Sequence, residues 1–270
     1  MTEEYFKCIK EKSNKFEHSS MKYIGYEDIA DYKVCVEDEN IILIHGFNVE
    51  ANINEYHWAT SKVEYLIEFL KDKEDFLITF IPHQWVSTLE EAGFVVRNAW
   101  HDYFMNNLEN ITYSEKFDFL TEDMCDEASK LTMMCKNQSR GFTGQTTKWM
   151  EEWINNTEVS GVSTGTRNNA VLIEKNQEDE IIGLICVATY AHESEKGPIT
   201  WIREIAVNPS YQNKGIGRKL MMKALSYGKK YGATGAFLAA DECNDAGIHL
   251  YTTIGFEASE DDSQIDMIKQ

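Results

Sequence analysis

Residues 205–220 read Ile205-Ala-Val-Asn-Pro-Ser-Tyr-Gln-Asn-Lys-Gly-Ile-Gly-Arg-Lys-Leu220 and are the most informative segment of the chain. An apolar β-type run ends at Val207, a proline turn follows, and a glycine-containing loop then opens a run with helical periodicity. The first N–H groups of such a helix have no acceptor within the helix and carry the positive end of its dipole. Because Gly215 and Gly217 allow close approach to the backbone, the stretch predicts a phosphate-binding site.

The charge of the chain points to the same place. The 270 residues include 26 Lys+Arg and 45 Asp+Glu, for a formal net charge of −19, which argues against nucleic acid as a partner. Residues 205–240 nevertheless contain no Asp or Glu, where about six would be expected at the chain average. This cationic window holds Lys214, Arg218, Lys219, Lys223, Lys229 and Lys230. A small anionic ligand and a basic helix face without a ligand would both account for it.

Several broad classes are not expected. The first 15 residues carry charges throughout and no apolar core, so the sequence predicts no secretory signal. The longest apolar run, at 181–191, is far shorter than the roughly 20 residues of a membrane-spanning helix. The six cysteines form no CxxC pair and no zinc-like spacing, which favours reduced thiols, a cytoplasmic location and no metal site.

The second part of the chain alternates between β-type and helical runs. Strands are expected at 117–120, 170–174, 181–190, 199–207 and 236–240, with a last strand pair around Phe256 and 265–268. Helices are expected after Thr121 and at 146–155, 216–231 and 246–253, and a polar loop at 156–169.

The first part of the chain repeats the end of this pattern. Strands are expected at 40–47, 76–81 and 95–104, and a helix at 56–71. A further helix ends in Leu89-Glu-Glu-Ala-Gly-Phe94, which parallels Leu250-Tyr-Thr-Thr-Ile-Gly-Phe256. Either the chain is an internal duplication that divides near 107–114, or helix–Gly–Phe–strand recurs by chance. The duplication gives domains at 1–112 and 113–270.

These motifs resemble those of the GNAT superfamily of acyl-CoA-dependent N-acyltransferases. Gln212, Gly215 and Gly217 match its [QR]-x-x-G-x-[GA] signature, and Val207, Pro209 and Tyr211 match the preceding V-x-P-x-[YWF] pattern. The downstream helix at 244–256 is also similar, with Gly247 where the family usually has Ala. A dinucleotide loop would need a third glycine at Leu220, and a Walker loop would need GK[ST], so both alternatives are weaker.

The resemblance implies an α/β (α+β) fold, with a mixed, mostly antiparallel twisted sheet flanked by helices. It implies that acetyl-CoA lies where strands 199–207 and 236–240 separate. The pantetheine would pair with the backbone of Ile205, Ala206 and Val207. The pyrophosphate would be held by the amides of Gln212, Asn213, Lys214, Gly215, Ile216 and Gly217 and by the cations Lys214, Arg218 and Lys219, and Asn244 would be a further polar contact or only a helix N-cap.

Two residues are candidates for proton transfer. Glu204 would accept the proton of the amine, or would merely pair with Arg203. Tyr251 would protonate the departing thiolate, or would merely pack in the core. A covalent intermediate on Cys186 or Cys243 is not favoured, because neither has a histidine beside it in the sequence.

The resemblance therefore predicts an N-acetyltransferase that acts by direct attack in a ternary complex. The acceptor would be a small-molecule amine, with a cationic one as an option, or a peptide amine; nucleic acid and membranes are not expected, and the oligomeric state is left open. The first half has Gly46-Phe-Asn-Val-Glu-Ala-Asn-Ile53 in place of the glycine loop, and is expected to be a smaller, degenerate GNAT-like domain without CoA. A CoA-binding regulatory module without catalysis is the alternative function.

Overall fold

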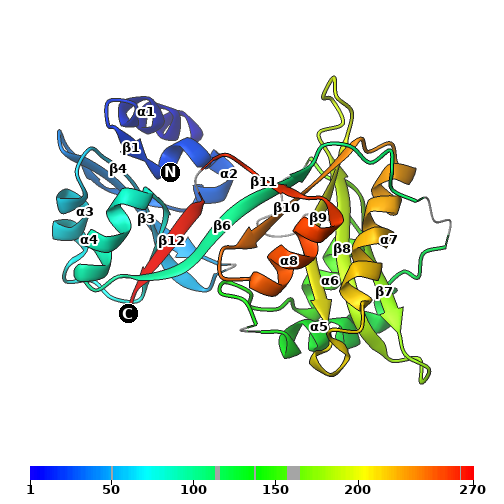
Figure 1. The fold of residues 1–270 in the computed structure, drawn as a ribbon. Coiled ribbons are helices and arrows are strands. Elements are labelled where there is room, and N and C mark those ends of the chain that lie inside the picture. The colour runs from blue at the N-terminus through cyan, green and yellow to red at the C-terminus, as the bar shows by residue number, and fades with distance from the viewer. Residues whose placement is uncertain (50, 113–115, 137, 157–164, 262) are drawn as a thin grey trace. The chain divides into compact units, whose positions relative to one another are not determined.

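The computed structural model describes residues 1–49, 51–112, 116–136, 138–156, 165–261 and 263–270 (Figure 1). The chain forms two compact units. Unit 1 comprises Met1–Trp100 with Asp262–Gln270, and unit 2 comprises His101–Asp261. The division thus falls within strand β6 (Val95–Met105), twelve residues before the boundary expected at 112.

Unit 2 has a mixed sheet with helices on both faces, as the sequence predicted. Its strands follow the order β6, β10, β9, β8, β7, in which β6 takes part through its second half. Strands β9 and β10 are parallel, whereas β7, β8 and β9 form an antiparallel meander. The bounds are β7 (Arg167–Lys175), β8 (Ile181–Tyr190), β9 (Ile199–Val207), β10 (Gly235–Asp241) and β11 (Glu257–Ala258).

Two apolar clusters attach helices to the two faces of this sheet (Figure 1). Helices α7 (Ile216–Lys230) and α8 (Asp245–Ile254) pack on one face, around Leu220, Ala224 and Tyr251. Helices α5 (Cys125–Met134) and α6 (Thr147–Ile154) pack on the other, around Trp153 and Leu184. The predicted helical period is confirmed in α7, since its fully buried residues Leu220, Met221, Ala224 and Leu225 recur at that spacing.

Unit 1 repeats this architecture. Its sheet order is β2, β3, β4, β5, β12, β6, and only β4 and β5 are parallel. The strand bounds are β1 (His18–Ser19), β2 (Lys33–Glu37), β3 (Ile41–Asn48), β4 (Ile53–Thr60), β5 (Phe76–Ile81) and β12 (Gln264–Lys269). The helix bounds are α1 (Glu3–Ser13), η1 (Ser20–Tyr23), α2 (Tyr26–Ile29), α3 (Val63–Leu70), η2 (His83–Trp85) and α4 (Val86–Glu91).

The order of elements along the chain is shared by the two units. Each unit begins with helices, continues with a three-stranded meander, and then adds a helix, a parallel strand and a second helix. In unit 1 these are β2 to β4, α3, β5 and α4, and in unit 2 they are β7 to β9, α7, β10 and α8. The predicted duplication therefore extends over far more of the fold than the helix–Gly–Phe–strand ending from which it was inferred.

Three expected elements were wrong in part. The helix expected at 56–71 begins only at Val63, because residues 53–60 form strand β4, whose buried Glu55 and His57 hide the apolar alternation of a strand. The strand expected at 117–120 is a single bridge between Phe119 and Leu172, followed by the turn η3 (Glu122–Met124). The last strands do not form a hairpin with each other, since β11 and β12 each pair with β6.

Other expectations concern residues outside the described ranges. The expected loop at 156–169 includes 157–164, and the expected divide at 107–114 includes 113 and 114. The meander strands at 181–190 and 199–207 match the expected bounds. The described helices include none long and apolar enough to cross a membrane.

Each unit is completed by a strand that is distant in sequence from its meander. In unit 1, β12 lies between β5 and β6 and contributes the buried Ile265 and Met267 to the core. In unit 2, the second half of β6 lies next to β10 and contributes the buried Tyr103 and Met105. The sheet of unit 1 is therefore complete only with β12, and the sheet of unit 2 only with the second half of β6.

A fragment of residues 113–270 is therefore expected to be unstable. It lacks the β6 residues beside β10, exposes that strand edge, and loses Tyr103, Met105 and Leu108 from the core, each worth about 1.5–3 kcal/mol of burial. Residues 101–261 keep all of these contacts. Thermal unfolding followed by circular dichroism should show a cooperative transition for 101–261 and none for 113–270; equal transitions would contradict this assignment of β6.

Candidate functional site

The centre of unit 2 is the point where β9 and β10 separate. Their parallel register covers only the first three residues of each strand, and the last pair is Trp201 with Phe237. Beyond this pair, β9 continues to Val207 and β10 to Asp241, with no further pairing between them in the described part of the chain. A strand edge that has no neighbouring strand can bind an extended ligand through backbone hydrogen bonds.

The glycine loop follows directly at the end of β9. Asn213 and Gly215 have φ of 59° and 81°, in the left-handed region that favours glycine, and Gly215 is the N-cap of α7. The amide of Gln212 donates to the carbonyl of Pro209, whereas the amides of residues 213–218 find no acceptor among the described residues. Five of the six amides predicted to hold a pyrophosphate are therefore available at one helix N-terminus.

Gln212 braces this loop through its side chain. Its Nε2 donates to the carbonyl oxygen of Val207 at 3.0 Å and to Oε1 of Gln138 at 2.8 Å. The same carbonyl also accepts from Sγ of Cys135 at 3.4 Å. Because both lone pairs of the Val207 carbonyl are occupied, that group is not available to pantetheine in this arrangement.

The cations of the window divide between the loop and the rest of α7. Lys214 lies over the ring of Tyr211, and Arg218 reaches Oγ1 of Thr253 at 3.4 Å, so both stay beside the free amides. Lys219 and Lys223 instead pair with the two oxygens of Glu174, at 2.5 Å and 2.6 Å. Lys219 is thus engaged by a carboxylate and not by the loop for which the sequence proposed it.

A β-bulge in β9 sets the position of Glu204. Cys186 and Val187 of β8 pair with Glu204 and Ile202, so Arg203 is inserted as the extra residue. Ile202 consequently packs toward α7, and Glu204, two residues on, lies on the side of α5 and α6. Without the extra residue, the alternation of a strand would turn both side chains to the same face.

The buried carboxylate of Glu204 is held by two donors. Nε2 of Gln145 and a guanidinium nitrogen of Arg203 both donate to Oε1, each at 2.8 Å. The ion pair with Arg203, which the sequence offered as the alternative role, is therefore present. It is compatible with a role as base, since a positioned carboxylate still accepts protons.

Sequence reasoning missed Gln145. Its backbone is fixed on both sides by α5: its N–H donates to Oγ1 of Thr132 at 2.9 Å, and its carbonyl accepts from Oγ of Ser129 at 2.8 Å. Gln145 lies 59 positions before Glu204, in a connecting segment without a recognisable motif. No signal in a single sequence links these two residues.

Tyr251 on α8 lies within electrostatic range of Glu204. Burial, the charge of Glu204 and the neighbouring Tyr103 raise the pKa of Tyr251 well above its ordinary value. Its hydroxyl has no hydrogen-bond partner within the described ranges, and its ring lies 6.4 Å from that of Tyr103. The phenol therefore keeps its proton and has it available for a ligand.

Asn244 caps α8. Its Oδ1 accepts from the amide of Gly247 at 3.0 Å. A Cβ on Gly247 would lie 2.6 Å from Nδ2 of Asn244, so the glycine that departs from the usual alanine makes room for this cap. The N-capping role is thus present, and the Nδ2 group is the part of Asn244 left for a ligand.

The other reactive side chains do not form a second centre. Cys186 is fully buried, and burial together with the charge of Glu204 raises the pKa of its thiol, which disfavours a nucleophilic thiolate. Trp149 and Trp153 are buried, and their rings stack with centroids 5.1 Å apart, so both pack in the core. Across the described residues, no three His, Cys, Asp or Glu side chains are arranged to hold a metal.

Unit 1 has the same strand separation but fills it with its own chain. The register of β4 and β5 ends at Tyr56 and Ile78, and β1 then pairs with Ala59 and Thr60 of β4. Oγ of Ser20 completes the closure by accepting from the amide of Trp58 at 2.9 Å. The strand edge that is open in unit 2 is therefore occupied in unit 1.

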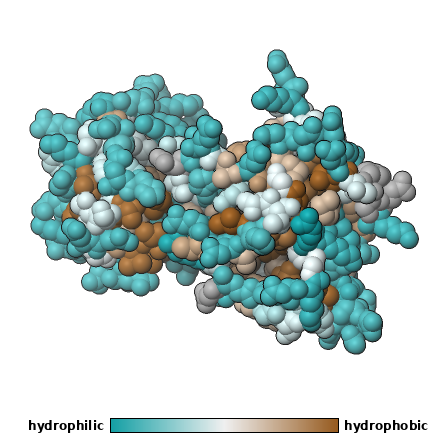
Figure 2. All heavy atoms as spheres, viewed as in Figure 1, coloured by the Kyte–Doolittle hydropathy of each residue, from teal (hydrophilic) through white to brown (hydrophobic). Residues whose placement is uncertain are grey.

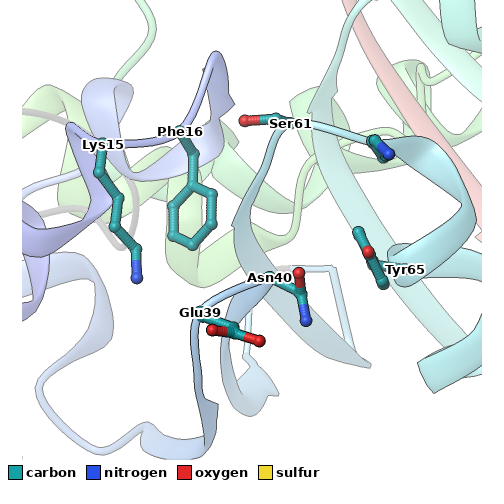
Figure 3. A pocket seen from close by; sticks show the side chains of 7 residues that line it. Lys15, Phe16, Glu39, Asn40, Ser61 and Tyr65 are labelled. Atoms are coloured by element: carbon teal, nitrogen blue, oxygen red, sulfur yellow. The ribbon is translucent and has the colours of Figure 1, made fainter.

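The loop equivalent in unit 1 is also different from the expected one. Residues 46–53 include the end of β3 and the connection to β4, and the chain passes from β4 to α3 through Ser61 and Lys62 alone. A cavity of about 260 Å³ lies there, lined by Lys15, Phe16, Glu39, Asn40, Ser61, Lys62 and Tyr65 (Figure 3). It contains none of the predicted site residues and no glycine loop.

Comparison with known proteins agrees with this geometry. Residues 131–256 match the model of the acetyltransferase (GNAT) family. An uncharacterized N-acetyltransferase of Methanocaldococcus jannaschii is 35% identical over 75 residues, which are 28% of this chain and 33% of that protein. A mycothiol acetyltransferase of Nocardia farcinica is 29% identical over 68 residues, which are 25% of this chain and 22% of that protein. The chain thus spans a third or less of these relatives.

Solved structures share the fold at low sequence identity. A conserved protein of unknown function from Staphylococcus epidermidis superposes with a TM-score of 0.56 at 12% identity, over 93% of this chain and 99% of its own. A GCN5-related N-acetyltransferase from Sphaerobacter thermophilus gives 0.52 at 10% identity, over 86% and 81%. Residues 131–256, which lie within unit 2, thus match the acetyltransferase (GNAT) family, and the fold is similar to that of the solved structures.

Proposed function

We propose that this chain transfers an acetyl group from acetyl-CoA to a primary amine by direct attack in a ternary complex. The observation that carries the proposal is the set of unpartnered amides at the start of α7, next to the point where β9 and β10 separate. Burial and the charge of Glu204 raise the pKa of Tyr251, which supports a joint role for these two side chains. A diphosphate and an extended chain are the two features of CoA that such a surface would bind.

The cofactor contacts follow from the groups that the protein leaves without partners. The amides of residues 213–217 would bind the pyrophosphate, with Lys214 and Arg218 beside them. The pantetheine would pair with the backbone at Ile205 and Ala206 and with the N–H of Val207, because the carbonyl of Val207 is already occupied. Lys219 would contribute only to the electrostatic potential around the loop and would not contact the pyrophosphate, since its ammonium pairs with Glu174.

Glu204 and Tyr251 have complementary tasks in the reaction. The amine nitrogen attacks the thioester carbon while Glu204, directly or through water, accepts a proton from nitrogen. The C–N bond forms, the C–S bond breaks, and the thiolate leaves next to the phenol of Tyr251. Because its pKa is raised, Tyr251 stabilises the thiolate chiefly by donating a hydrogen bond and transfers its proton only as the C–S bond breaks.

The two halves would differ in role. Residues 113–270 would form the catalytic domain and residues 1–112 a degenerate GNAT-like domain, which would lend the second half of β6 to the sheet of the catalytic domain. The closure of the β4 edge by β1 supports the view that the first domain does not bind CoA. A location in the cytoplasm is part of the same proposal.

The roles of the two catalytic candidates lead to distinct kinetic effects. We expect Glu204→Gln to lower kcat/KM for an alkyl amine about 100-fold or more, and Tyr251→Phe to lower kcat about 10-fold, with acetyl-CoA affinity unchanged. The Glu204→Gln defect should shrink as the pH rises toward about 10, because the amine then loses its proton without a base. CoA release would be followed with melting temperatures as the control.

The outcome also separates the two functions. Wild-type rates in both variants would remove the assigned roles. Tight binding of acetyl-CoA in calorimetry, without turnover on any amine, would instead favour a CoA-binding regulatory module.

A pair of substitutions tests Asn244. Asn244→Ala removes the cap and should lower the free energy of unfolding by about 1 kcal/mol, whereas Asn244→Asp keeps an Oδ1 acceptor and should change it little. If Nδ2 also contacts CoA, both variants will raise the Kd for acetyl-CoA, measured by calorimetry. Unchanged affinity in Asn244→Asp would show that Asn244 is only a cap.

A further inference from the structure

Four partly exposed aromatic side chains form a continuous row on unit 2. The ring centroids are 5.1 Å apart between Phe104 and Phe237, 6.2 Å between Phe237 and Tyr190, and 6.5 Å between Tyr190 and Trp201. None of the four is fully buried. We call this set the aromatic row; one end is Trp201 on β9 and the other is Phe104 on β6.

The aromatic row lies on the side of the sheet to which Glu204 points. Trp201 packs against Trp153 of α6, and Glu204 binds Gln145 just before α6. Trp201 and Phe237 of the row belong to the part of β9 and β10 that is still paired, on the N-terminal side of the separation. The glycine loop follows the C-terminal end of β9, on the other side of the separation. Ala239, next on this face of β10, is exposed although it belongs to a central strand. A ligand can therefore reach both the row and Glu204.

Carboxylates lie at the Phe104 end of the aromatic row. Glu257 of β11 pairs directly opposite Phe104, and Asp102 is two residues from it on the same face of β6. Burial raises the pKa of Tyr190, and the charge of Asp102 adds to this, so the carboxylate lies within electrostatic range of the row. Neither Asp102 nor Glu257 forms an ion pair with any residue that the structure describes.

The Trp201 end already holds a cation. The guanidinium of Arg203 lies 5.9 Å from the ring of Trp201 and pairs with Glu204 at 2.8 Å. Aromatic faces attract cations through their electron density, and nearby carboxylates add to this attraction. The remaining rings, with Asp102 and Glu257 beside them, offer the same chemistry to a ligand.

We infer that the acceptor is an aliphatic amine that carries a second ammonium group, and that the aromatic row binds this second group. This inference rests on the proposed function, since the reacting amine must lie next to Glu204. Trp201 and Glu204 are three residues apart along β9, or about 10 Å at the rise of a strand. Because Arg203 already lies over Trp201, this is the shortest spacing, and it needs two nitrogens joined by at least about six methylene groups, as in 1,6-diaminohexane. Only the reacting nitrogen is acetylated, and the second ammonium is unchanged.

The test compares three acceptors of equal length: 1,6-diaminohexane, n-hexylamine and 6-aminohexanoate. We expect KM for the diamine to be at least 10-fold lower than for hexylamine, and KM for 6-aminohexanoate to be the highest. Raising the salt concentration should weaken the preference, because the attraction is partly electrostatic. Equal KM for the diamine and hexylamine would overturn the inference and leave the proposed function intact.

Matched variants distinguish the loss of an aromatic ring from general damage to the fold. Tyr190→Leu removes an aromatic face and should raise KM for the diamine about 10-fold without changing that for hexylamine, whereas Tyr190→Phe should change neither. Asp102→Asn should raise KM for the diamine alone, most strongly at low salt. Equal effects of Tyr190→Leu and Tyr190→Phe, or equal losses for both acceptors, would contradict the assignment.

A binding measurement keeps the inference testable if turnover fails. With no CoA release from any amine, the proposed function would be wrong, and calorimetry with 1,6-diaminohexane and n-hexylamine would then decide. Preferential binding of the diamine that is lost in Tyr190→Leu would support the aromatic row as a cation site. Absent or equal binding of the two amines would refute it.

Discussion

The rest of the site depends on the early end of the pairing between β9 and β10. Had the parallel register continued past Trp201 and Phe237, backbone hydrogen bonds would have joined the two strands along their length. Because the register stops, the edge of β9 becomes available, the bulge at Arg203 can turn Glu204 toward α6, and Tyr251 can approach from α8. The proposed binding surface and the proposed acid–base pair of Glu204 and Tyr251 thus have one structural origin. The face of the molecule drawn in Figure 2 is mostly hydrophilic, with smaller hydrophobic patches between the hydrophilic residues.

In unit 1, the backbone groups that the corresponding strand separation exposes are hydrogen-bonded by another segment of the same unit. Its parallel strands part after Tyr56 and Ile78, yet β1 and Ser20 take up the exposed edge of β4. A buried edge without partners would be costly, so a fold that retains this separation needs an occupant for it. In unit 1 the occupant belongs to the chain, and we propose that in unit 2 it is a cofactor. The difference between the two units therefore lies in what fills the separation and not in the fold.

The parts of this structure that could be predicted from sequence are those encoded locally. The glycine loop, the meander and the period of α7 depend on turn chemistry and on alternation within short windows, and the strand at 199–207 was found to the residue. Strand β4 was missed because its buried polar residues, Glu55 and His57, obscure its pattern. The role of Gln145 and the position of β12 in the sheet could not be predicted for another reason, because each depends on contacts with residues far away in sequence.

The cationic window shows where a count of charges stops being informative. Two of its six cations neutralise Glu174, Lys229 donates to the carbonyls of Glu109 and Ile111, and Lys230 lies over the ring of Phe117. Lys214 and Arg218 alone remain beside the loop. Most of the recognition of an anion would thus fall to backbone amides, whose direction is set by the left-handed Gly215 and not by charge. The absence of Asp and Glu matters more than the excess of Lys and Arg, since a carboxylate near these amides would compete for the same N–H groups.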